Sequence, residues 1–257
     1  MLLCPVRDCR LHLEREARRV FCARGHSFDI ARTGYINLLQ PQDRRSRQPG
    51  DTAQAVAARR RLHDLGVTGP LIQGIAEMSR LTRDDIVLDA GCGNGDFLGT
   101  LATQTGFAGF GVDISVAAVD AAARRYPGGE WIVANADRFI PYAAATFSAV
   151  LSITARRNAA EFRRVLRAGG RLLIAIPSPD DLVELRGPGR DRVPGALEAF
   201  ARDFELLAHR RVTTAAELDA AALQDVLHSI YRPIGSPPAA PLRVTFGLDL
   251  LHFRITP

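Results

Sequence analysis

The chain contains 257 residues, of which 47% are hydrophobic and 24% charged, a balance that supports a full globular core and excludes a disordered chain. No apolar run approaches the ~20 residues that a membrane-spanning helix requires. The N-terminus lacks the basic and then apolar order of a secretion signal. We therefore expect a cytoplasmic protein with no membrane partner.

The positive charge is concentrated near the N-terminus. Arginine accounts for the whole Lys+Arg total of 33, and the formal net charge is +5. Residues 1–65 hold 13 arginines against 7 acidic residues, whereas residues 66–257 hold 20 against 21. This asymmetry favours a polyanion as the partner of the N-terminal part.

Three of the four cysteines precede a histidine in a compact set near the N-terminus. The set consists of Cys4, Cys9, Cys22 and His26. Cytosolic proteins rarely keep disulfides, and three thiolates with one imidazole are a usual tetrahedral set for Zn²⁺. His26 is a better fourth ligand than His12, because the Cys22-x3-His26 pair falls on one turn. The long Cys4-x4-Cys9 spacing should strain Asp8. The alternative is three ordinary cysteines and a surface histidine.

Composition divides the chain into three predicted parts. Residues 1–39 are too few to build a core unaided and should depend on the metal. Residues 40–84 form a basic linker with breakers, followed by a helical connector with helices at 52–65 and 70–79. Residues 85–257 should form the catalytic domain.

From residue 85, short apolar runs alternate with helical stretches, which is typical of a mainly parallel sheet with helices on both faces. Strands are predicted at residues 86–90, 110–113, 131–134, 149–153 and 171–176, and later at 204–212 and 243–253. Helices are predicted at residues 96–103, 116–126 and 159–166.

Two helix starts carry capping signals. Asn158 should cap the helix at 159–166, with Glu161 completing a capping box and the glycine pair at 169–170 ending the helix. Thr214 with Glu217 should cap a helix that lies between the last two strands.

A glycine-rich loop follows the first strand, where residues 89–95 read DAGCGNG. The glycines permit a sharp turn, and the next helix offers free amides to a ligand. The spacing differs from the GxGxxG of dinucleotide folds, and the loop lacks the lysine of a phosphate loop. Asp113, at the next strand end, can accept hydrogen bonds from a ribose, and residues 135–137 can meet an adenine edge. A nicotinamide-type dinucleotide domain or a purely structural turn is the alternative.

This progression of DxGxGxG, an acidic residue and N-x-D is similar to the class I S-adenosylmethionine-dependent methyltransferases. The resemblance implies an α/β fold with a doubly wound sheet, mostly parallel with its last strand antiparallel, and a small N-terminal zinc-binding module. It also implies S-adenosyl-L-methionine as the cofactor. The predicted cofactor-binding residues are Asp89, Gly91, Gly93, Gly95, Asp96, Asp113, Asn135, Ala136 and Asp137.

A second resemblance is more specific. Three segments of the chain are the run HSFDIARTGYINLLQP, the linker ending RQPGD and the segment ARRRLHDLG. They resemble the 23S ribosomal RNA guanine-N1 methyltransferases, which include macrolide-resistance relatives. The match spans about Cys4 to Gly187. It implies methyl transfer to guanine N1 in a 23S hairpin, with residues 1–39 helping to grip the RNA. Relatives usually place a tyrosine against the cofactor near Thr68, which we include in the cofactor site.

The implied reaction sets requirements for the catalytic residues. N1 lies on the Watson–Crick edge, so the guanine must be unpaired or flipped out. The sulfonium is a strong methyl donor, so catalysis needs positioning and charge stabilisation and no covalent nucleophile. The candidate catalytic residues lie in the loops after the fourth and fifth strands and are Arg156, Asn158 and Asp181. The relatives usually have a proline at position 156 and a histidine near position 181. An arginine could stabilise charge on O6, and a carboxylate could accept the N1 proton. The alternative is polar helix starts facing water.

The basic segment supplies the candidate RNA contacts. Phosphate contacts are predicted for Arg44, Arg45, Arg47, Arg59 and Arg60. The alternative is a solvated connector. Phe28 and Tyr35 could stack on bases, although packing of the zinc module against the catalytic domain explains them better.

Two other functions compete with this interpretation. One is a small-molecule methyltransferase whose zinc module serves folding or dimerisation, and the other is a divergent, non-catalytic, zinc-dependent RNA-binding paralogue. The sequence leaves open which guanine is modified, whether the role is housekeeping or antibiotic resistance, and whether the chain forms a homodimer.

Overall fold

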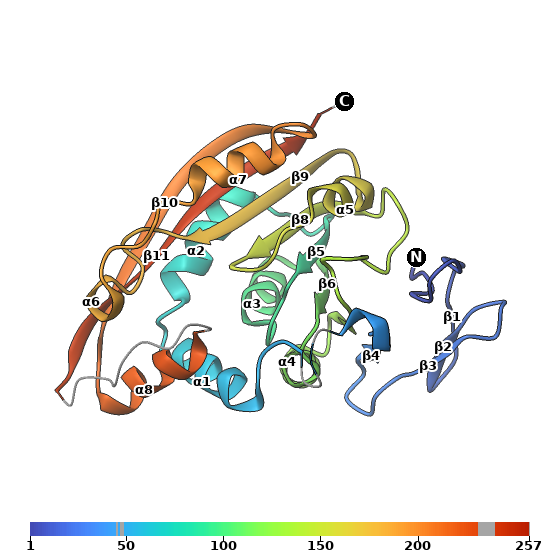
Figure 1. Cartoon of the computed structure of the whole chain (residues 1–257), viewed down its shortest axis with the longest axis horizontal. Coiled ribbons are helices and arrows are strands. Elements are labelled where there is room, and N and C mark those ends of the chain that lie inside the picture. The colour runs from blue at the N-terminus through green and yellow to red at the C-terminus, as the bar shows by residue number, and fades with distance from the viewer. Residues whose placement is uncertain (45, 47–48, 231–239, 257) are drawn as a thin grey trace.

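A computed structural model of the chain describes residues 1–44, 46, 49–230 and 240–256 (Figure 1). One sheet with the strand order β10-β11-β9-β8-β5-β6-β7-β4 runs through the molecule. Its strands are β4 (Ile36–Asn37), β5 (Ile86–Ala90), β6 (Ala108–Asp113), β7 (Glu130–Val133), β8 (Phe147–Ile153), β9 (Leu166–Pro177), β10 (Phe204–Leu218) and β11 (Leu242–Ile255).

The sheet is mostly parallel, as predicted. The neighbours from β4 through β9 pair in parallel, whereas β11 is antiparallel to both β9 and β10. All seven residues of β8 are buried, because a central parallel strand has helices over both of its faces. The prediction of a doubly wound sheet with an antiparallel last strand is therefore confirmed.

Helices cover the two faces of the sheet in separate layers. On one face, a buried apolar cluster joins α2 (Gly69–Ser79), α3 (Asp96–Thr105) and α4 (Val116–Arg125) to the strands. On the other face, a second cluster includes α5 (Ala159–Val165) and α7 (Val193–Phe200). None of the helices in the described part of the chain has the length and hydrophobicity needed to span a membrane.

The start of α5 follows the prediction only in part. The side-chain oxygen of Asn158 accepts a hydrogen bond from the Glu161 amide at 3.2 Å, which confirms the cap. The Glu161 carboxylate instead accepts from the Ile140 amide at 2.8 Å and pairs with Arg164, so it is not used for a capping box. The helix ends at Val165 and β9 begins at Leu166, so the glycine stop was wrong. The chain enters the sheet before it reaches the glycines.

The second predicted cap, Thr214 with Glu217, is also wrong. Both residues lie in β10, which continues to Leu218 because it pairs with β11 along almost its whole length. The helix between these strands is α8 (Ala220–Ser229), and Asp219 caps it by accepting a hydrogen bond from the Ala222 amide at 2.8 Å. Sheet pairing overrides a local capping signal here.

The N-terminal residues form a small sheet that lies at the end of the molecule opposite β10 and β11 (Figure 1). Its strands are β1 (Glu14–Arg15), β2 (Arg19–Phe21) and β3 (Ser27–Asp29). The Leu3 amide donates a hydrogen bond to the Pro141 carbonyl at 2.9 Å, and Leu2 and Val20 belong to the apolar cluster of the catalytic sheet. Strand β4 pairs with β7 at the sheet edge. The module and the catalytic domain therefore share one core.

The aromatic residues of the module serve this packing. Phe28 packs against the cluster on one face of the sheet, and Tyr35 packs against the cluster on the other face. Ile36 and Leu38 are fully buried between the module and the sheet. These contacts confirm packing as the role of the aromatic and apolar run.

Helices α1 (Ala53–Asp64) and α8 lie at the bottom of the molecule in Figure 1, and α6 (Val183–Arg186) lies at the left beside β10 and β11. The linker contains a short 3-10 helix, η1 (Pro41–Asp43), and leads to α1, which packs against α8. The one-turn helix α6 follows β9.

Candidate functional site

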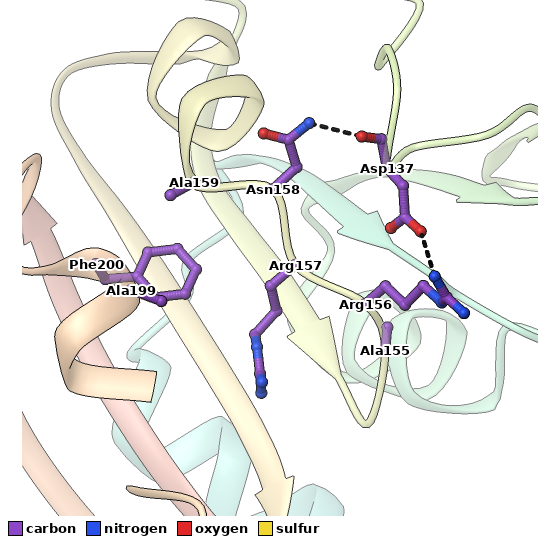
Figure 2. A pocket seen from close by; sticks show the side chains of 8 residues that line it. All are labelled: Asp137, Ala155, Arg156, Arg157, Asn158, Ala159, Ala199 and Phe200. Atoms are coloured by element: carbon purple, nitrogen blue, oxygen red, sulfur yellow. Dashed lines mark hydrogen bonds and ion pairs between the residues drawn. The ribbon is translucent and has the colours of Figure 1, made fainter. Parts of the chain in front are cut away.

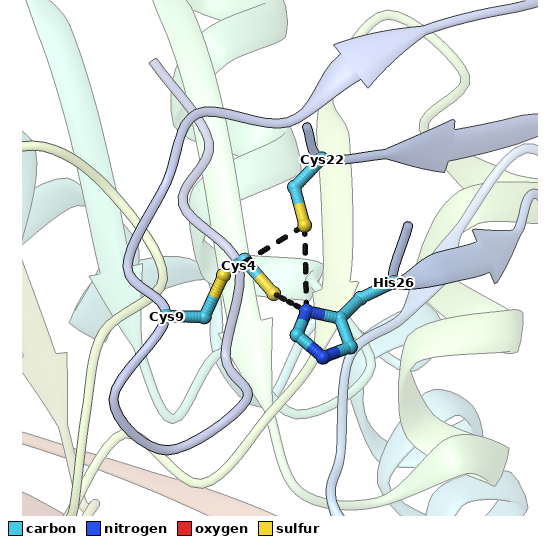
Figure 3. A group of neighbouring side chains, drawn as sticks. All are labelled: Cys4, Cys9, Cys22 and His26. Atoms are coloured by element: carbon cyan, nitrogen blue, oxygen red, sulfur yellow. Dashed lines mark hydrogen bonds between the residues drawn. The ribbon is translucent and has the colours of Figure 1, made fainter. Parts of the chain in front are cut away.

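The four predicted zinc ligands converge in the N-terminal module (Figure 3). Their ligand atoms all lie within 4.8 Å of one another. The Cys9 and Cys22 sulfurs are 3.7 Å apart, and the Nδ1 atom of His26 is 3.4 Å from the sulfurs of both Cys4 and Cys22. Zn–S bonds of about 2.3 Å and Zn–N bonds of about 2.0 Å in a tetrahedron imply edges of roughly 3.8 and 3.5 Å. The set therefore fits Zn²⁺, with His26 as the fourth ligand.

The backbone around Cys9 adapts to the long spacing between the first two ligands. Asp8 and Arg10 have φ values of 65° and 52°, in the left-handed region that most residues avoid. The strain predicted for Asp8 is confirmed. All four cysteines of the chain are free and buried, and Cys92 lies far from the metal set, in the glycine loop.

The glycine loop between β5 and α3 forms the second site. The Asp113 carboxylate accepts hydrogen bonds from the Gly93 amide at 2.9 Å and from the Ser115 amide at 2.8 Å. These two bonds hold the loop against the carboxyl end of β6. A side chain at Gly95 would approach the Trp131 ring to 2.6 Å, whereas one at Gly93 would meet no atom within 4 Å. The loop is therefore packed on one side and open at Gly93.

Asp89 lies beneath this loop at the end of β5 and is almost fully buried. Its Oδ1 atom has no hydrogen-bond partner in the part of the chain that the structure describes. A buried polar atom without a partner is costly, so it indicates a group that is bound in the functional state. The open side of Gly93 and this orphaned oxygen together fit S-adenosylmethionine, whose sulfonium and ammonium groups are positive.

Burial, and then the nearby carboxylate of Asp113, raise the pKa of Asp89 from 3.8 to about 8. A folded pKa above the unfolded value means that the contribution of Asp89 to stability is present at low pH and is lost as the pH rises toward 8. We expect Asp89→Asn to be more stable than the wild type near pH 8 and similar near pH 4, in thermal melts without cofactor. Parallel melting curves for the two proteins across this range would contradict the expectation.

The linker is held at both of its ends by residues that follow β6 and β7. The side-chain amide of Asn135 donates to the Asp43 carbonyl at 3.0 Å, and Arg138 donates to the Asp43 carboxylate at 2.8 Å. Farther along, the Ser115 hydroxyl donates to the Asp51 carbonyl at 2.7 Å. The sequence analysis did not identify Ser115 or Asp51, although the Gly-Asp end of RQPGD is a turn signal.

The other predicted cofactor residues surround this loop. Ala136 packs against the core, and the Asp137 amide donates to the Asn135 side chain at 3.1 Å. Asp96, at the start of α3, accepts from the Asn94 side chain at 2.7 Å, and burial raises its pKa. The hydroxyl of Thr68 lies 2.6 Å from Nδ1 of His63, whose charge acts on Asp96. Thr68 is therefore within hydrogen-bond distance of His63, a residue that the sequence analysis did not identify.

An open pocket of about 610 Å³ adjoins the glycine loop (Figure 2). A side chain at Gly91 would collide with Ala155, so the wall of the pocket touches the loop directly. Arg156 pairs with the Asp137 carboxylate at 3.5 Å, and the side-chain amide of Asn158 donates to the Asp137 carbonyl at 2.8 Å. The lining residues are Asp137, Ala155, Arg156, Arg157, Asn158, Ala159, Ala199 and Phe200.

Asp181 is not among the residues that line this pocket. Its carboxylate accepts hydrogen bonds from the Gly247 amide at 3.1 Å and from the Arg186 guanidinium at 2.6 Å. Burial raises the pKa of this carboxyl. One oxygen therefore holds the segment after β9 against β11, and the other joins Asp181 to α6 within that segment.

The arginines predicted to contact RNA have different surroundings. Arg44 is exposed, whereas Arg45 and Arg47 lie outside the described residues. Arg59 donates to the Ser229 carbonyl at 2.8 Å and pairs with Asp51, so it ties α1 to α8 and to the linker. Arg60 is exposed and lies 3.8 Å from Asp64.

The strand order, the glycine loop and the acidic residue at the end of β6 define a class I S-adenosylmethionine-dependent methyltransferase, here fused to a zinc ribbon. Two protein families match the chain accordingly: "RlmA, N-terminal" over residues 2–47, and "Methyltransferase domain" over residues 87–170. The chain is 36% identical over 237 residues to the 23S rRNA (guanine(748)-N(1))-methyltransferase of Streptomyces fradiae, covering 88% of this chain and 83% of the relative. The chain belongs to the family of 23S rRNA guanine-N1 methyltransferases.

A solved structure agrees on the fold of the catalytic domain. The TehB-like SAM-dependent methyltransferase from Corynebacterium glutamicum matches 79% of this chain and 99% of its own, with a TM-score of 0.51 and 20% identity. The cofactors of the protein are S-adenosylmethionine and Zn²⁺, and the N-terminal cluster of three cysteines and one histidine has the ligand set that a zinc ion requires.

Proposed function

We propose that the protein methylates N1 of one guanine in a hairpin of 23S ribosomal RNA, in the cytoplasm where that RNA is made, and that the target corresponds to guanine 748. The observation that most directly supports this proposal is the similarity, over 88% of the chain, to a relative that is named for this reaction. The zinc ribbon at the edge of the catalytic sheet supports an RNA substrate, because residues 1–65 hold 13 arginines against 7 acidic residues and so carry the positive charge that a polyanion requires.

The pocket next to the glycine loop is the proposed site of the flipped guanine. It lies where Ala155 touches Gly91, so a base inside it would be close to a ligand that the loop holds. The bound S-adenosylmethionine supplies an electrophilic methyl group, and the chain therefore needs to orient the base and to manage one proton.

Asp137 and Arg156 are the proposed polar residues that face the base. Asp137 carries the one carboxylate among the residues lining the pocket, and Arg156 pairs with it while 73% of its side chain is exposed. We propose that the Asp137 carboxylate accepts the N1 proton and that Arg156 stabilises the negative charge that develops on O6. The side chain of Asn158 caps α5 and donates a hydrogen bond to the Asp137 carbonyl, so we propose that Asn158 positions Asp137 and Arg156.

Replacing Asp137 with asparagine keeps the backbone contacts of the loop and removes the proton acceptor. We expect kcat for RNA methylation to fall by about 100-fold, since general acid–base catalysis contributes ~10²–10⁴-fold. Raising the pH should restore part of the rate, because solvent then removes the N1 proton. Asp181→Asn is the matched control and should alter thermal stability more than kcat. An unchanged kcat for Asp137→Asn would remove Asp137 from this role.

The function is tested by incubating the purified protein with unmodified 23S ribosomal RNA and methyl-labelled S-adenosylmethionine, and then mapping stops of reverse transcription. A methyl on N1 blocks base pairing, so one strong stop beside the target guanine is expected. Label in ribose would show a different reaction. Absence of label in RNA, together with cofactor binding, would favour the small-molecule methyltransferase, and absence of cofactor binding would favour the non-catalytic RNA-binding paralogue.

We further propose that the protein forms a homodimer. Strand β10 is the outermost strand of the sheet, and Leu206 and Leu207 on it are 40% and 46% exposed. An outermost strand has unpaired backbone groups along one side, and together with two exposed leucines they offer a surface for pairing with a second copy. Light scattering coupled to size-exclusion chromatography measures the mass, and a monomer at micromolar concentration would contradict the proposal.

A further inference from the structure

Arg157 is a cation in the pocket that the reaction described above does not use. It lines the pocket beside Arg156, but its side chain projects in a different direction, away from Asp137 (Figure 2). Among the described residues, Arg157 has no hydrogen bond, ion pair or ring contact, and its side chain is exposed to solvent. Most of the other described arginines of the catalytic domain pair with a carboxylate, so Arg157 is unusual in having no such partner.

A second cation lies near Arg157. Arg192 lies just before α7, at the end of that helix opposite Phe200. Its guanidinium donates one long hydrogen bond of 3.4 Å to the carbonyl of Pro177, the last residue of β9, which pairs with β8 beside the loop that carries Arg157. Arg192 forms no ion pair with a described carboxylate, although its charge opposes the rise that burial causes in the pKa of Asp181. Partial burial lowers the pKa of Arg157, and the charge of Arg192 lowers it further. An anion bound between the two guanidinium groups would remove this repulsion.

We propose that Arg157 and Arg192 bind a phosphodiester group of the RNA strand next to the flipped guanine. This inference rests on the proposed function, because it takes RNA as the substrate. A guanidinium offers a planar fork of N–H donors that matches two phosphate oxygens, and a flipped nucleotide needs its backbone fixed while its base leaves the stack. The clamp would hold the backbone at the rim while Asp137 and Arg156 face the base.

The carboxylate of S-adenosylmethionine is the other anion that could reach this part of the protein. The contact between the pocket and the glycine loop is made by Ala155, whereas Arg157 lies on the side of the pocket formed by α7. This placement favours the RNA strand over the cofactor. The two ligands are also separable by experiment, because only RNA binding releases a large number of counterions.

The test measures the Kd of a synthetic 23S hairpin containing guanine 748 at several salt concentrations, for the wild type, Arg157→Gln, Arg192→Gln and the double variant. Each lost phosphate contact should reduce the slope of log K against log salt by about 0.7–1. We expect each single variant to weaken RNA binding several-fold at low salt and to leave the Kd of S-adenosylmethionine unchanged. Arg157→Lys should recover most of the slope, since it retains the charge.

Arg83→Gln is the matched control, because Arg83 is exposed, has no ion pair among the described residues, and precedes β5, at the amino end of the strand and away from the pocket. Its slope should equal that of the wild type, and thermal melts confirm that all variants fold. A wild-type slope in the Arg157 and Arg192 variants would overturn the clamp. A weaker Kd for S-adenosylmethionine with an unchanged RNA slope would overturn it in favour of the cofactor carboxylate. If the wild type forms no methylated RNA, the proposed function is wrong. RNA methylation is measured independently of the salt dependence of RNA binding, so this failure is distinguishable from failure of the clamp.

Discussion

Replacing Cys22 with serine is expected to remove zinc from the purified protein and to abolish methylation of ribosomal RNA. Cys22 lies at the centre of the cluster, 3.7 Å from the Cys9 sulfur and 3.4 Å from Nδ1 of His26. A structural zinc site contributes ~10–16 kcal/mol of apparent binding free energy, which small modules need in order to fold. The strands of this module are only two or three residues long, so they have little other support.

The same variant should keep its affinity for S-adenosylmethionine. The apolar cluster that lies under the glycine loop contains no residue from the first 30 positions. Leu2 and Val20 do belong to the cluster on the opposite face, so the melting temperature should fall while the cofactor site stays formed. Metal analysis, calorimetry with the cofactor and RNA methylation then separate the roles of the module.

Cys92→Ala is the matched control for this experiment. Cys92 is buried like the ligands, but it lies in the glycine loop, outside the metal set. Its replacement should leave the zinc content equimolar with the chain. If Cys22→Ser retained zinc, or methylated RNA at the wild-type rate, the interpretation of the cluster as a required zinc site would be wrong.

The catalytic sheet was predictable because its strands are buried on both faces and read as apolar runs. The bounds of β5 agree with the prediction, and β8 is longer than predicted by the two residues Phe147 and Ser148. The lengths of the late elements were not predictable in the same way. Residues 213–218 have a local capping signal, and only their pairing with β11, from a distant part of the chain, keeps them in β10.

The site was predictable where residue type and strand end coincide. Asp113 ends β6 and does hold the glycine loop, and the metal ligands follow from spacing alone. Contacts made by the linker were not predictable, because the bond from Ser115 to Asp51 joins positions 64 residues apart. Arg59 illustrates the same limit, since a basic run does not reveal that one member is used to join α1 to α8.

Replacing Asp113 with alanine should weaken binding of S-adenosylmethionine by at least ~100-fold. Burial raises the pKa of the Asp113 carboxyl. One of its oxygens accepts a hydrogen bond from the Gly93 amide, and the other accepts one from the Ser115 amide. Removing the carboxylate leaves two amide groups unsatisfied, at ~1–3 kcal/mol each. A difference of ~1.4 kcal/mol in binding corresponds to tenfold in Kd, so loss of the loop shape accounts for the expected effect.

Asp113→Asn distinguishes the two ways in which the carboxylate could act. The asparagine oxygen still accepts from one amide, but its NH₂ group faces the other, so we expect a Kd between those of the wild type and Asp113→Ala. Asp84→Ala is the control, because Asp84 is exposed just before the other end of β5. Calorimetry gives the Kd of each variant, and thermal melts show whether the sheet remains folded. If Asp113→Ala binds the cofactor as tightly as the wild type, then the glycine loop and β6 do not form the methyl donor site, and the orphaned oxygen of Asp89 must serve a different ligand.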